Sequence, residues 1–177
     1  MKTAIVHCNV YTGQNAWEDG LVLIEDGAIA YVGAAAPFTA DEVIDAKGGI
    51  CLPGLVTAHT HSAMSLMRGV GAGLPLMDWL QVIFPIEDRL TDERVYWGSM
   101  LSIMEMIRRG TTAFADMYFF MPAVARAVLE TGMRANLVRS LTSLEKLPEA
   151  EAFFREFDGA GEGRVRALRL DHLREEK

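Results

Sequence analysis

The segment that decides the fold is PGLVTAHTH, residues 53–61. Its apolar residues run into His59 and His61, which lie two positions apart, so on an extended strand both imidazoles project from the same face of a stiff backbone. Two imidazoles in that arrangement can reach one metal ion. A His-x-His pair taken alone is also compatible with two polar residues at the rim of a strand, because short motifs carry a high false-positive risk. The sequence around the segment decides between the two.

Beyond this segment, strand-like and helix-like stretches alternate. The clearest helix is predicted from Asp92 to Arg109, since Thr91 can cap it, acids fill its first turn, and Gly110 follows the cations at its end. Further strands are predicted over residues 111–117, 134–141 and 165–170, and further helices over 122–132 and 147–157. This alternation favours a parallel sheet built from βα units.

The predicted helix over residues 92–109 carries an apolar stripe at helical spacing. Its members are Trp97, Met100, Leu101, Met104 and Ile107. Core packing explains the methionines of this helix better than a cofactor site does.

Residues 1–51 consist of short β-type segments separated by turn signals. Strands are predicted over residues 2–7, 20–25, 28–32 and 42–45, with Asp26-Gly27 supplying a tight hairpin turn. A sheet of about 50 residues is too small to bury a core alone. We therefore predict two domains: residues 1–52, the N-terminal part of a composite β-sandwich domain, and residues 53–177, the first half of a barrel.

The predicted fold class is α/β. A closed (β/α)₈ barrel takes about 250 residues, about twice the length of the stretch from Pro53 to Lys177. We expect a partial (β/α)₈ TIM-like barrel of about four strands, preceded by a small antiparallel β-sandwich-type segment. A small open α/β sheet is the alternative. In a barrel, the two histidines lie at the carboxyl end of a strand, where barrel active sites form.

The same segment, continued by Met64, Leu66 and Arg68-Gly69, resembles the first barrel strand of the cyclic amidohydrolases. Two further stretches, WLQVIFPIE (residues 79–87) and GTTAFADMY (residues 110–118), narrow the resemblance. They point to the branch containing the S-adenosylhomocysteine and 5′-methylthioadenosine deaminases and the triazine chlorohydrolases. The resemblance covers nearly the whole chain and implies hydrolytic deamination of an adenine nucleoside: S-adenosylhomocysteine, 5′-methylthioadenosine or adenosine.

The resemblance also implies that His59 and His61 bind one divalent metal, with zinc the expected cofactor and iron the alternative. The remaining ligands, a histidine and an aspartate, belong to later strands. The glutamate and histidine that move protons in the family are also absent from these 177 residues. We therefore expect no catalytic residue here beyond the metal ligands. Because structural and catalytic zinc sites use three or four protein ligands, the isolated chain is expected to bind metal weakly and to catalyse poorly or not at all.

Three residues are candidates for substrate binding by the same resemblance. Glu87 matches a glutamate that accepts hydrogen bonds from ribose hydroxyls; otherwise it is an ordinary acid at a helix start. Arg139 resembles an arginine that contacts the substrate tail, for which a carboxylate is the expected group; otherwise it is a cation at the barrel rim. His172 falls by counting at a histidine that touches substrate, but its neighbours differ, and a charged terminal tail is the favoured interpretation. Asp116 is assigned a structural role or a supporting role behind the metal ligands, because the metal aspartate of the family lies much later in the sequence.

Composition restricts the partners. The net charge of −7 is spread without a basic run, which argues against nucleic acid. No apolar stretch approaches the roughly 20 residues that cross a bilayer, so no membrane partner is expected and the expected location is cytoplasmic. The expected partner is a small-molecule nucleoside. The exposed strand edge of a half-barrel also favours a homo-oligomer or association through that edge.

Two alternatives to an incomplete deaminase remain open. One is a non-catalytic, amidohydrolase-like chain that needs a partner to complete its barrel. The other is an amidohydrolase acting on guanine, cytosine or a triazine. Glu87 favours a ribose-containing substrate over these, because a carboxylate offers two acceptor oxygens to a vicinal diol.

Overall fold

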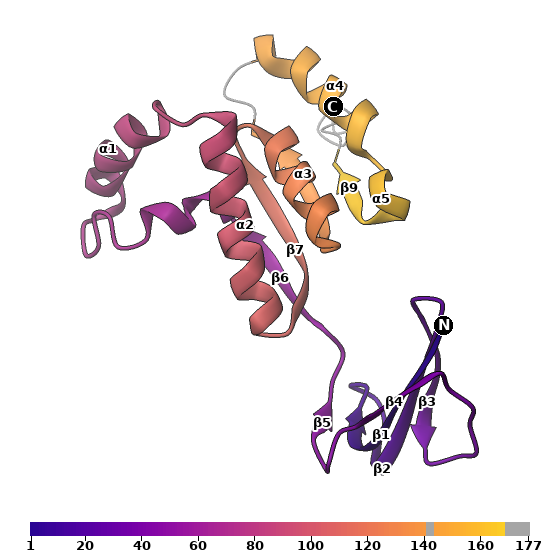
Figure 1. The fold of residues 1–177 in the computed structure, drawn as a ribbon. Coiled ribbons are helices and arrows are strands. Elements are labelled where there is room, and N and C mark those ends of the chain that lie inside the picture. Colours follow the sequence, from indigo (N-terminus) through magenta and orange to yellow (C-terminus); the bar gives the residue numbers. More distant parts are fainter. Residues whose placement is uncertain (141–143, 169–177) are drawn as a thin grey trace, which may run out of the picture. The chain divides into compact units, whose positions relative to one another are not determined.

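The structure is a computed structural model that describes residues 1–140 and 144–168. The chain divides into two compact units, Met1–Pro53 and Gly54–Lys177 (Figure 1). In the part of the chain that is described, no helix is both long and apolar enough to cross a membrane.

The first unit is a five-stranded sheet. Its strands are β1 (Lys2–Tyr11), β2 (Ala16–Glu25), β3 (Ala28–Ala34), β4 (Glu42–Asp45) and β5 (Ile50–Cys51). They lie in the order β3-β2-β1-β4, and β5 also pairs with β1. The predicted antiparallel pairing holds for β1, β2 and β3, whereas β4 and β5 run parallel to β1. The difference arises because the connection after β3 carries the chain from one edge of the sheet to the other, where β4 starts in the direction of β1.

The turn between β2 and β3 is the hairpin turn that the sequence predicts. Asp26 and Gly27 have φ angles of 51° and 81°, the left-handed pair that a two-residue hairpin turn requires. Strand β1 is longer than predicted, because an irregularity between Ile5 and Cys8 lets it continue past His7, whose φ is 51°.

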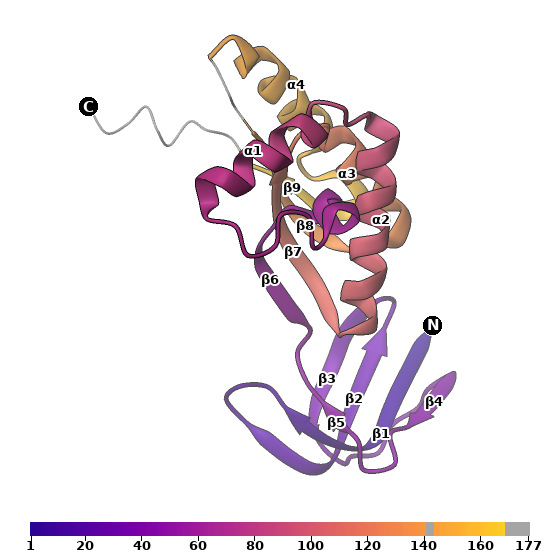
Figure 2. The same cartoon turned by 90° about the vertical axis from the view of Figure 1, so that its left-hand side faces the viewer.

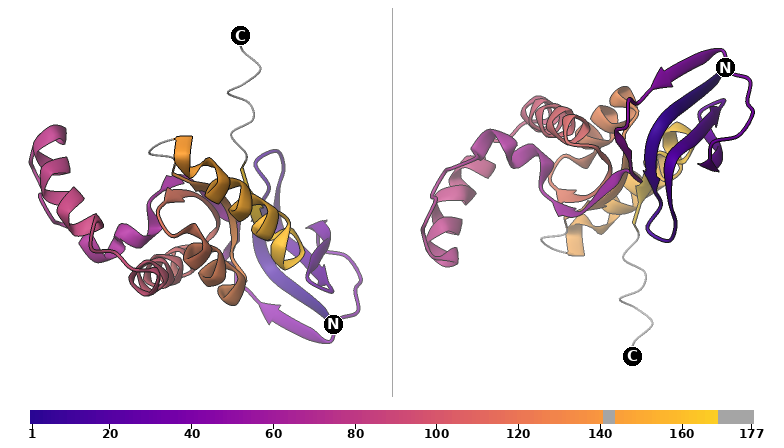
Figure 3. Two further views of the ribbon diagram at one scale, coloured as in Figure 1. Left: turned by 90° about the horizontal axis from the view of Figure 1, so that it is seen from above. Right: turned by 90° about the horizontal axis from the view of Figure 1, so that it is seen from below.

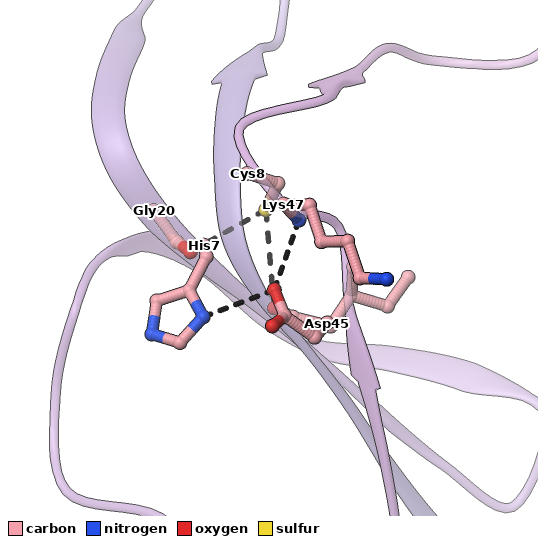
Figure 4. A network of polar contacts seen from close by, with 6 residues as sticks. His7, Cys8, Gly20, Asp45 and Lys47 are labelled. Carbon is pink, nitrogen blue, oxygen red and sulfur yellow. Dashed lines mark hydrogen bonds and ion pairs between the residues drawn. The ribbon is translucent and has the colours of Figure 1, made fainter.

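A polar cluster connects β1 to the end of β4 (Figure 4). The Asp45 carboxylate accepts hydrogen bonds from His7 Nδ1 at 3.0 Å and from the Lys47 backbone N–H at 2.9 Å. Both side chains of the His7–Asp45 pair are exposed. Next to them, the buried Cys8 thiol donates to the Gly20 carbonyl at 3.4 Å, and burial raises the pKa of that thiol. The exposed pair and the buried thiol hold neighbouring strands of one sheet together.

The second unit contains a four-stranded sheet. The strands are β6 (Leu55–Thr60), β7 (Thr111–Tyr118), β8 (Arg134–Arg139) and β9 (Val165–Ala167). They lie in sequence order and every neighbouring pair is parallel. Figure 2 shows them side by side. This is the predicted beginning of a βα barrel, built strand by strand around its circumference.

Helices connect these strands. They are η1 (Ser62–Met67), α1 (Leu76–Glu87), α2 (Asp92–Arg108), α3 (Met121–Thr131), η2 (Leu144–Lys146), α4 (Leu147–Phe157) and α5 (Ala160–Gly163). Seen from above in Figure 3, α2 and α3 follow one another around the strands. Helix α1 is not among the predicted helices. Pro85 stands in its last turn, where a proline normally argues against helix.

Helix α2 begins as its sequence predicts, with Thr91 Oγ1 accepting from the Arg94 N–H at 3.3 Å. Its buried face differs from the predicted one. Val95, Gly98, Ser99 and Ile103 face the core, while Trp97 and Met104 of the apolar stripe are largely exposed. The small residues decide the packing: a Cβ at Gly98 would lie 2.5 Å from the Ala63 carbonyl oxygen, so only glycine allows η1 to approach this closely.

Candidate functional site

His59 and His61 lie together at the carboxyl end of β6. Their ring centroids are 4.9 Å apart and the ring planes are nearly perpendicular. His59 is exposed and His61 is partly buried. The His59 ring forms no hydrogen bond within residues 1–140 and 144–168. Two imidazoles this close, on one strand end, have the spacing needed to share a cation.

The His61 ring is held by a backbone carbonyl. Its Nδ1 lies 2.6 Å from the Met117 oxygen at the end of β7. A carbonyl can only accept, so Nδ1 must donate, and in the neutral ring the lone pair is then on Nε2. A carbonyl behind the ring is the usual way in which proteins orient a histidine ligand. The donor set therefore fits a divalent metal, with His61 Nε2 as one ligand.

The described ranges contain no cluster of three or more His, Cys, Asp or Glu side chains able to hold a metal ion. Two histidines are fewer than the three or four protein ligands of structural and catalytic zinc sites. Any further protein ligand for this site must come from outside these ranges.

Asp116 anchors the backbone that carries His61. Its buried carboxylate accepts from the Ser62 backbone N–H, at 3.3 Å to each oxygen, and from the Ser62 hydroxyl. Ser62 Oγ also lies 3.0 Å from Ser99 Oγ of α2. Burial raises the pKa of the Asp116 carboxyl, while the hydrogen bonds from Ser62 oppose that shift. Asp116 therefore connects the end of β7 to the residue that follows His61.

Glu87 is the last residue of α1, not the start of a helix as its alternative interpretation supposed. Its Oε1 accepts from the Tyr118 hydroxyl at 2.7 Å. Tyr118 is buried at the end of β7, and its ring centroid lies 5.8 Å from that of His61. Burial, followed by the bond to Glu87, raises the pKa of Tyr118, so the phenol stays protonated and donates. Glu87 Oε2 forms no hydrogen bond to the described residues.

Sequence reasoning missed Tyr118 as a site residue. The signal was present, because Tyr118 closes the stretch over residues 110–118 and, as the last residue of β7, lies at the same sheet edge as His61.

The candidate site residues line two neighbouring cavities. The first, of about 160 Å³, is lined by His61, Glu87 and Tyr118 among others. The second, of about 560 Å³, is lined by Glu87 and Arg139 among others. Glu87, Phe119 and Ser140 line both. The structure thus brings three of the predicted site residues to neighbouring cavities, while His59 lines neither and His172 lies outside the described residues.

Arg139 is the last residue of β8. One Nη atom pairs with Glu149 at the start of α4. Its Nε is buried and has no hydrogen-bond partner among the residues that the structure describes. Because a buried donor without a partner costs free energy, Arg139 is suited to bind an acceptor group within the larger cavity.

The chain belongs to the amidohydrolase family, whose model matches residues 50–175. This confirms the resemblance drawn from the three sequence stretches.

Curated relatives place the chain more closely. It is 47% identical over 165 residues to a 5-methylthioadenosine/S-adenosylhomocysteine deaminase of Desulforamulus reducens, covering 88% of this chain and 38% of the relative. It is 48% identical over 161 residues to a 5′-deoxyadenosine deaminase of Methanosarcina mazei, covering 86% of this chain and 37% of that protein. The chain spans less than two fifths of the length of these relatives.

Solved structures agree on the fold. An adenosine deaminase from Xanthomonas campestris with bound zinc matches with a TM-score of 0.85 and 29% identity over 94% of this chain and 42% of that one. The zinc complex of atrazine chlorohydrolase TrzN from Arthrobacter aurescens matches with a TM-score of 0.85 at 19% identity, covering 94% of this chain and 46% of that one, which shows the fold alone. The predicted partial barrel is confirmed.

Proposed function

We propose that this chain forms the N-terminal part of a metal-dependent enzyme that deaminates an adenine nucleoside, with S-adenosylhomocysteine, 5′-methylthioadenosine or adenosine as the substrate. One observation carries the proposal: His61 is oriented by the Met117 carbonyl beside His59 and lines the cavity that also contains Glu87. The names of the relatives support the substrate class, since they act on adenosine derivatives.

His59 and His61 would hold the cation. Zinc is favoured because the similar adenosine deaminase structure from Xanthomonas campestris contains it, and iron is the alternative. A divalent cation at this position would supply a Lewis acid that lowers the pKa of a water molecule to about 7. Asp116 and Met117 fix the strand end and the ring orientation, so that His61 presents one nitrogen in one direction.

Glu87 and Arg139 would bind and orient the substrate. Tyr118 donates to one carboxylate oxygen of Glu87. The other oxygen, which has no partner in the described part of the chain, would accept hydrogen bonds from a ribose diol. Arg139, whose Nε has no hydrogen-bond partner among residues 1–140 and 144–168, would bind an anionic group on the substrate tail, for which a planar guanidinium is well suited. The two side chains line one cavity, so a single elongated ligand could contact both.

We also propose that Met1–Pro53 is the N-terminal part of a composite β-sandwich domain and that the protein is cytoplasmic. On one face, the sheet of this unit exposes Ile29 and Ile44, which a second layer of a sandwich would cover.

A chimera tests the proposed function. The matching N-terminal part of the D. reducens deaminase is replaced by this chain, and ammonia release is measured with 5′-methylthioadenosine, S-adenosylhomocysteine, guanine and a triazine. We expect turnover of the nucleosides. His59→Ala should lower kcat/KM by at least about a hundredfold, because ligand loss exceeds the effect of losing an outer contact. Glu87→Gln should raise KM for nucleosides and leave metal content unchanged.

The 177-residue chain assayed alone is expected to show no turnover. Nucleoside deamination by this isolated chain that persists in the His59→Ala variant would contradict the proposed ligand role. A folded, metal-containing chimera that converts guanine or a triazine but no nucleoside would contradict the proposed substrate class.

A further inference from the structure

The outer face of α2 is apolar and exposed. Trp97, Met104 and Ile107 retain 57%, 54% and 51% of their accessible surface. A groove of about 560 Å³ runs along this face, lined by residues of α2 from Trp97 to Arg108 and by Thr131 of α3. The opposite face of α2 already packs on the core through Val95 and Ile103. The exposed face is therefore not needed to hold α2 in its unit, and patches of this kind mark interaction sites.

Charges of opposite sign stand at the two ends of this apolar stripe. At 3.6 residues per turn, Glu93, Trp97, Leu101, Met104 and Arg108 fall within about 80° of the helix circumference. Glu93 lies in the first turn of α2 and Arg108 in the last. Both are exposed, and neither forms an ion pair within the described part of the chain. Among the other charges on α2, Asp92 pairs with Arg126 and Glu105 with Arg68. Arg94 donates instead to the Arg89 carbonyl oxygen, at 2.8 Å.

The apolar stripe with its two end charges is complementary to the same stripe on a second α2 helix that runs antiparallel to the first. A two-fold axis placed between Met100 and Leu101 sets Glu93 opposite Arg108 of a second helix, at both ends. The same axis sets Trp97 opposite Met104, and thioether sulfur packs favourably against aromatic rings. An interface with one patch used by both copies has this self-complementarity, whereas a groove for an unrelated helix does not require it.

We propose that the outer face of α2 binds a second copy of this chain, with the two α2 helices antiparallel about a two-fold axis. The apolar stripe supplies the buried centre, and the two Glu93–Arg108 pairs fix the direction and the register. The antiparallel arrangement also places opposite ends of the helix dipoles side by side. The interface lies on the helix face opposite the one that packs on the core, and it is independent of the proposed function.

Charge reversal tests the proposal with the intact chain. Glu93→Arg and Arg108→Glu are surface changes that should leave the fold intact, and association is measured by sedimentation at several concentrations. We expect a reversible dimer of the unchanged chain. Each variant alone should associate at least about tenfold more weakly, because like charges then meet at both ends. An equimolar mixture of the two variants should regain the dimer, because both ends of the mixed pair carry opposite charges.

Arg109→Glu is the matched control, since it changes the net charge equally from a neighbouring position outside the stripe, and it should leave association unchanged. A chain that stays monomeric would overturn the proposal. So would variants that associate as strongly as the unchanged chain, the outcome expected of pairing through the sheet edge. A mixture that associates no better than either variant would overturn it as well.

Discussion

The end of β6 and the polar cluster of the N-terminal sheet each contain a histidine bonded through Nδ1, and they differ in what surrounds that bond. His7 meets the Asp45 carboxylate at 3.0 Å, with both side chains exposed. His61 meets the neutral Met117 carbonyl at 2.6 Å, beside a second imidazole and in the wall of a cavity. A histidine is a candidate metal ligand when a backbone carbonyl fixes the orientation of its ring and a second imidazole lies beside it. The residue type alone does not decide this.

The aspartates of the two regions extend this comparison and give the largest expected effect. Asp116→Ala leaves the Ser62 N–H and hydroxyl buried without their acceptor, and should lower the free energy of unfolding by about 2–3 kcal/mol. Asp45→Ala removes bonds that water can replace and should have a much smaller effect. Urea denaturation followed by circular dichroism measures both. Equal losses from the two variants would show that burial does not separate the regions.

A tyrosine–glutamate bond gives an intermediate effect. Tyr118→Phe removes the hydroxyl that Glu87 accepts from, in a buried position, and should lower the free energy of unfolding by about 1 kcal/mol. Tyr96→Phe is the matched control, because its hydroxyl donates to Glu130 at 2.6 Å on the surface. The control should be close to neutral. If Tyr96→Phe costs as much as Tyr118→Phe, the strand-end contact has no special contribution to stability.

The smallest effect concerns the exposed pair. The pKa of Asp45 lies below its ordinary value of 3.8, first because of the Lys47 N–H and second because of His7. A depressed carboxyl pKa stabilises the fold above the unfolded value, and this stabilisation is lost as the pH falls through the folded value. His7→Ala should raise the Asp45 pKa part of the way back, followed by the NMR signal of its side-chain carbonyl carbon. An unchanged pKa, or a complete return to 3.8, would contradict this order of causes.

Much of the second unit could be predicted from the sequence. Alternating βα signals predicted the parallel sheet, and the cap at Thr91 predicted where α2 begins. The apolar stripe of α2 predicted the wrong buried face. Which face is buried depends on how closely Gly98 lets the helix approach η1, and the spacing of apolar residues does not show this. The parallel pairing of β4 with β1 was not predicted. The direction of β4 depends on the path of the connection from β3, which the local sequence pattern does not show.

The site was predictable only in part. His59 and His61 followed from spacing, and the contact between their rings agrees with the predicted common face. Tyr118 and Ser62 could not be found in the same way, because their contacts with Glu87 and Asp116 join residues 31 and 54 positions apart. Such pairs are set by how the strand ends meet in space.

The most direct test is a titration of the chain with Co²⁺, followed by NMR of the imidazole nitrogens. His59 and His61 should broaden together at the lowest Co²⁺ concentrations, before His7 responds, and His61→Ala should remove the early response of His59. If His7 broadens first, or if only one histidine of the strand-end pair responds, the two rings do not share a cation.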